Sequence, residues 1–228
     1  MPKEFPRIDI TVDAIIFGYK PNEGISVLLI KRKKNPFKSL WALPGGFVEA
    51  DESLDQAASR ELKEETGMDV TSLEQLYTFG EPKRDPRKRI ISVAYFAIVK
   101  PELYKVHAAD DAAAVQWFNI KKLPPLAFDH EKIVETAIFK LRKKVFNEPV
   151  GFELLNKQFA FTELHRLYET LCDKKINTSD IKKKLLSLGL LKRQKRKSEK
   201  QKKSNLQYKF NKSKYFKLKK KGIALQIN

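Results

Sequence analysis

The stretch from Gly46 to Met68, GFVEADESLDQAASRELKEETGM, constrains the fold of this chain most. Its spacing is G-x5-E-x7-R-E-U-x-E-E-x-G-U, in which U is an apolar residue. We predict a helix over residues 53–66, because Ser53 and Gln56 form a capping-box pattern and Gly67 can end the helix. Three glutamates of this helix stand at positions i, i+3 and i+4 and therefore share one face: Glu61, Glu64 and Glu65.

These three glutamates repel one another, and an ordinary surface helix would avoid this by alternating the signs of its charges. A hard divalent cation, Mg²⁺ or Mn²⁺, removes the conflict because it prefers carboxylate oxygens as ligands. Arg60 can pair with one glutamate and fix its rotamer. Without the other spaced positions, a solvated acidic helix would be the better interpretation. With all of them present, the pattern favours a metal site.

The chain around this helix alternates apolar runs with turn residues, which predicts an α/β fold with a mixed sheet. Residues 9–17 and 26–30 are expected to form a hairpin, and residues 90–99 a long central strand. Shorter strands are expected at residues 76–79 and 115–118, and residues 40–43 form a short apolar segment. A second helix is expected over residues 131–146, with Asp129 as its N-cap and His130 as a surface residue of its first turn.

Two basic segments between these strands could attract phosphate groups. One is residues 31–34, at the end of a strand; the other is the loop 80–89. In this loop, Arg84 and Arg87 could reach over a bound diphosphate and contact it in bidentate fashion. Both segments could instead be solvated surface. The glycines Gly45 and Gly46 would allow either a close approach of the backbone or a positive φ at this point.

The net charge of +18 is unevenly distributed along the chain. Residues 149–228 hold 22 Lys and Arg but 6 Asp and Glu, whereas residues 1–148 hold 24 and 22. A nearly neutral domain is therefore joined to a strongly basic one. This asymmetry points to nucleic acid or an anionic surface as the partner of the second domain, and the alternative is a lysine-rich segment that is merely soluble.

The pattern of the basic half predicts a winged helix-turn-helix. A helix opening at Phe161-Thr162, a short connection and a helix from Ser179 or Asp180 to Gly189 are followed by a basic arm, a polar wing tip at 197–205 and a strand at 206–210. Asn177 and Ser179 are candidate groove contacts. The side chains expected to contact DNA phosphates are Lys182, Lys183, Lys184, Lys192, Arg193, Lys195 and Arg196.

With every specified position matched, the stretch from Gly46 to Met68 resembles the Nudix box, and residues 5–147 resemble a Nudix domain. The resemblance implies an α/β/α sandwich that cleaves nucleoside diphosphates linked to another group, using a divalent metal and water. It implies that Glu61, Glu64 and Glu65 bind the metal. The implied catalytic residues are Glu64, Glu65, Arg60, which would orient a glutamate, and Glu52, which would lie near the metal or support the loop.

The segments around the box look like the ADP-ribose branch of the family. They are the run from Tyr77 to Arg87, the strand around Tyr95 and the run from Leu126 to His130. The resemblance implies that Gly45, Gly46, Arg84, Arg87 and Asp111 contact the ligand. The general base is left open between Asp110 and Asp111.

A Nudix domain over residues 1–148 followed by a winged helix over residues 149–228 is similar to the Nudix-related transcriptional regulators of the NrtR and AraR types. This similarity implies a homodimer that binds DNA at a palindromic operator and responds to an ADP-ribose-like nucleotide or a sugar. The alternative is a Mg²⁺-dependent ADP-ribose pyrophosphatase with a basic nucleic-acid-binding tail. A purely structural RNA-associated protein is disfavoured, because it leaves the clustered glutamates without a reason.

The cysteine content and the lengths of the apolar runs predict the compartment. The one cysteine, Cys172, is expected to be a buried small hydrophobe and fits a reducing compartment. The N-terminus shows no apolar signal region, and no apolar run reaches the length of a bilayer span. We therefore expect a soluble, cytoplasmic protein without a membrane partner.

Overall fold

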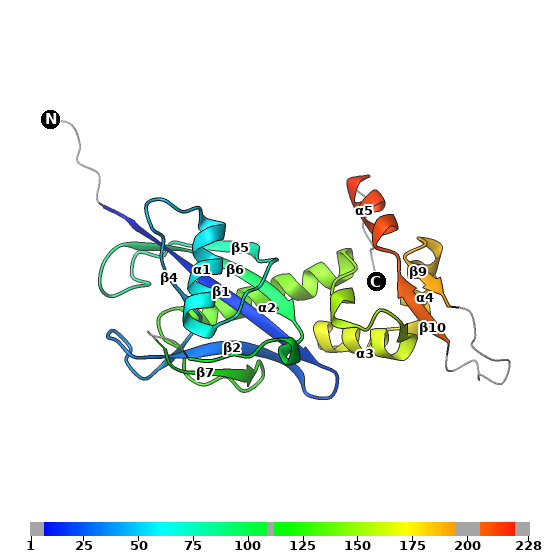
Figure 1. The fold of residues 1–228 in the computed structure, drawn as a ribbon, viewed down its shortest axis with the longest axis horizontal. Coiled ribbons are helices and arrows are strands. Elements are labelled where there is room, and N and C mark those ends of the chain that lie inside the picture. Colours follow the sequence, from blue (N-terminus) through cyan, green and yellow to red (C-terminus); the bar gives the residue numbers. More distant parts are fainter. Residues whose placement is uncertain (1–6, 109–111, 195–205, 222–228) are drawn as a thin grey trace. The chain divides into compact units, whose positions relative to one another are not determined.

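The computed structural model describes residues 7–108, 112–194 and 206–221. The chain divides into two compact units (Figure 1). The first holds Met1–Lys20 and Gly24–Ile138, and the second holds Pro21–Glu23 and Phe139–Asn228. The division falls inside helix α2, His130–Asn147. The domain boundary expected after residue 148 stays a prediction.

The first unit is built on one mixed sheet, as predicted. Its order is β3-β2-β1-β6-β5, with β4 paired to β1 and β7 paired to β2. Strands β1 and β6 run parallel along ten residue pairs, and the other pairs are antiparallel. The strands are β1 Asp9–Lys20, β2 Gly24–Arg32, β3 Trp41–Ala42, β4 Gly45–Phe47, β5 Glu74–Phe79, β6 Ile90–Val99 and β7 Ala112–Asn119.

Helix α1, Leu54–Thr66, carries the glutamates and packs on this sheet. Both halves of the predicted capping box are formed, since the Ser53 hydroxyl accepts from Gln56 N and the Gln56 side chain accepts from Ser53 N. Gly67 ends the helix in the left-handed conformation, with φ of 73°. Ala57 and Ala58 pack on Val12 of β1 and on Val93 and Tyr95 of β6, which turns the opposite side of the helix outward.

Helix α2 begins at His130, one residue before the expected start. Its N-terminal half buries Ile133, Val134 and Ala137. In Figure 1, α1 lies in front of the sheet and α2 crosses behind it. Asp129 was expected to cap the helix, but its carboxylate accepts two hydrogen bonds from Arg84. A short 3-10 helix, η1, spans Pro101–Leu103.

The second unit contains the predicted winged helix. Helices α3, Phe161–Cys172, and α4, Thr178–Ser187, are joined by a short connection, and three strands pair in the order β8-β10-β9. These strands are β8 Phe159–Ala160, β9 Leu191–Arg193 and β10 Gln207–Phe210, and a 3-10 helix, η2, spans Phe152–Leu154. The expected wing tip at 197–205 lies outside the described residues.

Two details of the second unit differ from expectation. Thr162 was expected to cap helix α3, but the helix begins two residues earlier than such a cap implies, and Ala160 N donates to the Glu163 carboxylate at 2.6 Å instead. A further helix, α5 Lys212–Lys220, follows β10 and was not predicted. Cys172 is buried as expected, and its burial raises the thiol pKa to about 11. No helix in the described part of the chain is both long and apolar enough to cross a membrane.

Candidate functional site

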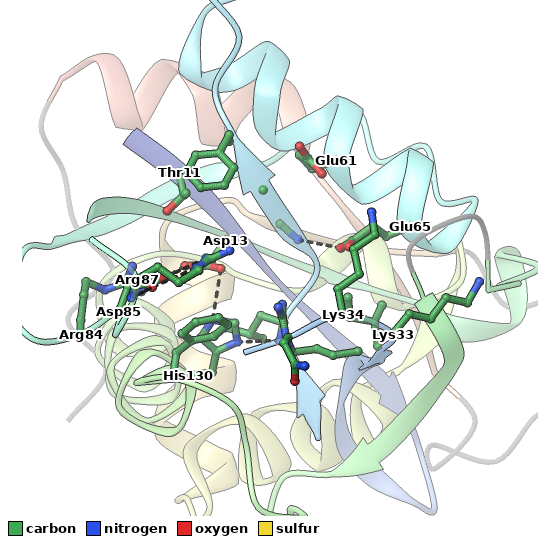
Figure 2. Close-up of a pocket in the computed structure, with 18 of the residues that line it drawn as sticks. Thr11, Asp13, Lys33, Lys34, Glu61, Glu65, Arg84, Asp85, Arg87 and His130 are labelled. Carbon is green, nitrogen blue, oxygen red and sulfur yellow. Dashed lines mark hydrogen bonds and ion pairs between the residues drawn. The ribbon is translucent and has the colours of Figure 1, made fainter. Parts of the chain in front are cut away.

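The glutamate face of α1 borders a cavity of about 430 Å³ in the first unit (Figure 2). Strand β4 lies between this helix and β1, and its two glycines are needed there. Gly45 N donates to Glu65 Oε2 at 2.9 Å. A Cβ on Gly46 would lie 2.3 Å from Glu61 Oε1, so a side chain at this position would displace the carboxylate. The glycines therefore let the backbone approach both glutamates, and their contact with a ligand stays a prediction.

Arg60 organises the glutamates more extensively than the sequence indicated. Its guanidinium donates to Glu52 at 2.6 and 2.9 Å, to Glu61 at 2.9 Å and to Glu64 at 3.2 Å. It also donates to the Phe47 carbonyl at 3.0 Å, which ties α1 to β4. The hydrogen bonds from Arg60 lower the pKa of Glu52 to about 2. Glu52 Oε1 also accepts a hydrogen bond from Glu49 N at 2.9 Å, which ties the loop before α1 to this side chain.

The three predicted metal ligands do not share one environment. Glu61 and Glu65 line the cavity, whereas the Glu64 side chain is 60% exposed and rests on Arg60. Burial raises the pKa of Glu61, and the hydrogen bond from Arg60 opposes this effect. Two carboxylates on one wall fit a Mg²⁺ or Mn²⁺ ion that completes its shell with water or substrate oxygens. Within the described ranges, no three His, Cys, Asp or Glu side chains enclose a metal site by themselves.

Cationic side chains also line the cavity. Figure 2 shows Arg87 across the cavity from Glu61 and Glu65, whereas Lys34 lies beside Glu65 and Lys33 extends outward. Burial lowers the pKa of Arg32, and the nearby charge of Arg87 adds to this effect. Arg32, Lys33 and Lys34 of the basic cluster border the cavity. The residues with ionisable side chains that line it are Asp13, Arg32, Lys33, Lys34, Glu49, Glu61, Glu65, Arg84, Asp85, Arg87 and His130.

The two predicted ligand-binding arginines play different roles. Arg84 is buried, donates to Asp129 at 2.7 and 3.0 Å, and lies 3.5 Å from Asp13. Arg87 pairs with Asp85 at 2.7 Å and remains 39% exposed. The Arg87 guanidinium also lies 5.6 Å from the ring centroids of both Phe47 and Phe128. The partly exposed Arg87 can therefore contact a ligand in the cavity. The buried Arg84 instead links Asp129 to Asp13.

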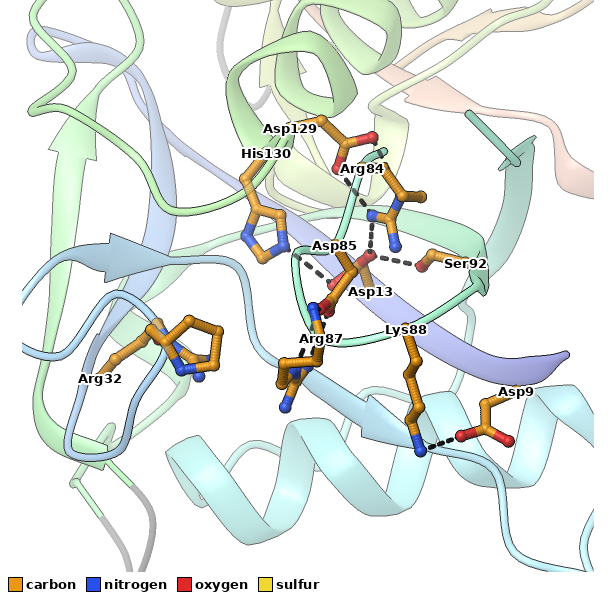
Figure 3. A network of polar contacts seen from close by, with 11 residues as sticks. Asp9, Asp13, Arg32, Arg84, Asp85, Arg87, Lys88, Ser92, Asp129 and His130 are labelled. Atoms are coloured by element: carbon orange, nitrogen blue, oxygen red, sulfur yellow. Dashed lines mark hydrogen bonds and ion pairs between the residues drawn. The ribbon is translucent and has the colours of Figure 1, made fainter. Parts of the chain in front are cut away.

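A buried polar network under the cavity was not predicted (Figure 3). Asp13 of β1 accepts a hydrogen bond from the Ser92 hydroxyl and lies 3.4 Å from His130 Nε2. His130 was expected on the surface, but it is 5% exposed, because α2 begins against the sheet. One signal could have revealed Asp13, which is a charged residue inside the apolar run of β1. The candidate bases Asp110 and Asp111 lie outside the described residues.

The predicted DNA contacts in the second unit are only partly exposed. Asn177 caps α4 by accepting from Ser179 N at 3.0 Å. Lys183 is exposed, whereas Lys182 and Lys184 are half-buried. The Lys182 ammonium lies 5.1 Å from the Phe161 ring centroid. On β9, Lys192 and Arg193 are exposed. Lys195 and Arg196 lie outside the described part of the chain.

A family model of the NUDIX domain matches residues 9–137, and a model of the NrtR DNA-binding winged helix domain matches residues 151–210. The first match alone covers more than half of the chain. The chain belongs to the NrtR-type Nudix proteins. This assignment confirms the predicted order of a Nudix domain followed by a winged helix.

Three relatives illustrate the NrtR-type assignment. The ADPR responsive transcriptional repressor NtrR of Acinetobacter baylyi is 32% identical over 82% of this chain and 76% of its own length. Shewanella oneidensis NrtR complexed with a 27mer DNA is 28% identical, with a TM-score of 0.71 over 91% of this chain and 95% of that one. Its NUDIX domain complexed with ADP ribose is 37% identical, with a TM-score of 0.56 over 62% and 93%.

A further relative matches a shorter part of this NrtR-type chain. The ADP-ribose pyrophosphatase of Methanocaldococcus jannaschii is 46% identical over 55% of this chain and 70% of its own length. The Nudix domain is thus similar both to a ligand-responsive regulator and to a hydrolase.

Proposed function

We propose that this protein is a DNA-binding transcriptional regulator whose Nudix domain binds an ADP-ribose-like nucleotide as effector. The observation that carries the proposal is the presence on one chain of a cavity with acidic and cationic walls and of an NrtR-type winged helix. The likeness to an ADPR responsive repressor along 82% of the chain supports the same conclusion.

The chemistry of the cavity suits a nucleoside diphosphate better than a neutral sugar. A diphosphate would place its charge between the cationic side chains and a divalent ion held by Glu61 and Glu65. The exposed ring of Phe47, with the Arg87 guanidinium beside it, offers an apolar and cationic surface to a base. Either Mg²⁺ or Mn²⁺ meets these requirements.

The winged helix would bind double-stranded DNA through α4 and β9. We propose that the protein acts as a homodimer on a palindromic operator, because two symmetric copies would place two recognition helices on successive half-sites. The compartment proposed for this activity is the cytoplasm, because its reducing conditions suit the free thiol of Cys172.

The decisive experiment measures DNA binding with and without the effector. DNA selected from a random duplex pool would be titrated with the protein by filter binding, alone and with ADP-ribose plus Mg²⁺. We expect an affinity that falls steeply with salt and changes when ADP-ribose is added. Arg87→Met should keep the DNA affinity and weaken the response to ADP-ribose. If the protein shows no DNA affinity even at low salt, the proposal fails.

A second function, hydrolysis of ADP-ribose, is favoured by the complete box and the 46% identical pyrophosphatase. The test incubates the purified protein with Mg²⁺ and ADP-ribose and measures AMP release. Glu65→Gln should abolish any turnover, and a preparation that releases no AMP contradicts this second function. Regulation and hydrolysis can coexist, with hydrolysis removing the signal.

A further inference from the structure

Helix α5, Lys212–Lys220, lies beyond the region that the winged-helix model matches, which ends at residue 210. Five of its nine residues are lysines, and Lys221 follows directly. Residues 200–228 contain no Asp or Glu. Lysines three and four residues apart on a helix repel one another by about 0.2–0.5 kcal/mol per pair. The helix therefore forms at an electrostatic cost that an anionic partner would remove.

The inner side of α5 is fastened to the second unit. The Tyr215 hydroxyl donates to Glu148 Oε2 at 3.1 Å, and Lys219 lies 3.4 Å from the same atom. Tyr215 also packs on Phe210 of β10, with ring centroids 6.0 Å apart. Tyr215 and Leu218 are half-buried, whereas the other residues of the helix are exposed. The side that carries Lys217 and Lys220 therefore faces away from the docked one.

The start of α5 is tied to the segment that joins α4 to β9. Asn211 N donates to the Leu190 carbonyl at 2.9 Å, and Asn211 Nδ2 donates to the Gly189 carbonyl at 3.1 Å. A Cβ built on Gly189 would lie 3.7 Å from Lys214 Cε. The lysines of α5 thus have a fixed position relative to α4 and β9, the two elements that carry the proposed DNA contacts.

We propose that α5 is a second DNA-binding surface, which contacts phosphates of the duplex beside those contacted by α4 and β9. This inference rests on the proposed DNA-binding function. Lysines bind phosphate as point charges without reading sequence, so α5 would add affinity and salt dependence but no specificity. An anionic membrane is a poorer partner, because Phe216 is the one large apolar side chain exposed on this helix and the inner side is already docked.

The test compares the variant Lys217→Gln/Lys220→Gln with the control Lys105→Gln/Lys122→Gln in full-length protein. Both variants remove two positive charges from exposed positions, and the control residues lie in the first unit. The probe is a mixed-sequence duplex of roughly 30 base pairs, about three helical turns. Fluorescence anisotropy gives the affinity over a range of salt concentrations, and thermal melting checks that each variant is folded.

For the α5 variant we expect weaker binding and a slope of log affinity against log salt that is about 1.8 units shallower, since each phosphate contact contributes about 0.9. The control should match the wild type. A variant that binds like the control overturns the inference, as does a variant that loses affinity for phosphatidylserine vesicles while its DNA isotherm is unchanged. If the wild type itself binds no duplex, it is the proposed function that fails.

Discussion

His130 Nδ1 accepts a hydrogen bond from the Leu43 backbone N–H at 2.8 Å, and its Nε2 lies 3.4 Å from Asp13 Oδ1. An Nδ1 that accepts carries no proton, so the imidazole is neutral and its Nε2–H faces the Asp13 carboxylate. Protonation would turn a second N–H toward the Leu43 N–H. Burial lowers the pKa of His130, which agrees with this tautomer.

The neutral state of His130 predicts how stability depends on pH. The unfolded chain binds a proton at His130 near the ordinary pKa of about 6.5, whereas the folded chain does so only at lower pH. Stability should therefore be full above this pH and fall below it, by at most about 1.4 kcal/mol per pH unit from this residue. Urea unfolding at several pH values checks this. His130→Gln should show a flatter pH dependence, and equal slopes in the two proteins would contradict the assignment.

Loss of Arg84 should be more costly than loss of Arg87. Arg84→Met leaves the buried Asp13 and the partly buried Asp129 without their shared cation, which costs about 3–5 kcal/mol of unfolding free energy. Arg87→Met removes a cation that is itself 39% exposed, so water can partly replace it at the buried Asp85 carboxylate, and it should cost less, about 1–2 kcal/mol. Denaturant titrations of both variants give the comparison. Similar losses would show that the Arg84 network contributes nothing special.

The metal site should depend on Glu61 and Glu65 more than on Glu64. Isothermal titration of Mn²⁺ into Glu65→Gln should show an affinity lower by roughly ten- to hundredfold. Glu64→Gln is the matched control, and it should lose less, because its side chain is 60% exposed and bound to Arg60. Equal losses in both variants would place Glu64 among the ligands, as the box alone predicts.

Two neighbouring lysines of α4 should behave differently. Lys183 is exposed, so Lys183→Gln should make the salt dependence of DNA binding shallower by about 0.9. The Lys182 ammonium lies over the rings of Phe161 and Tyr208. Lys182→Gln should therefore lower stability by about 0.5–1 kcal/mol and change the salt dependence less. Anisotropy titrations and thermal melting of both variants separate the two effects.

The sequence predicted the parts of the molecule whose signals are local. The capping residues Ser53 and Gln56 and the stop at Gly67 define α1 within one residue. The spacing of the box placed its glutamates on one face, and Glu61 and Glu65 do border the cavity. The missed parts depend on pairing between distant segments. Asp13 and His130 come close to each other because the start of α2 lies against β1 in the folded protein.

Helix α5 was missed for a different reason. Its lysines hide the apolar periodicity, since only Tyr215 and Leu218 mark the docked side. Its position is decided by tertiary contacts, namely Tyr215 with Glu148 and Asn211 with Gly189. Asn211 lies between the last residue of β10, Phe210, and a run in which lysines alternate with other residues. A pattern of charges does not reveal such contacts.

The guanidinium of Arg60, shared among Glu52, Glu61 and Glu64, makes these four residues depend on one another during evolution. Removing Arg60 leaves three carboxylates close together without their cation. Loss of one of these acids would then cost little stability, or would even increase it. Removing Glu64 while Arg60 remains merely frees one donor. Substitutions within the box should therefore be strongly non-additive. A lineage that abandons hydrolysis would be expected to lose these residues together rather than one at a time.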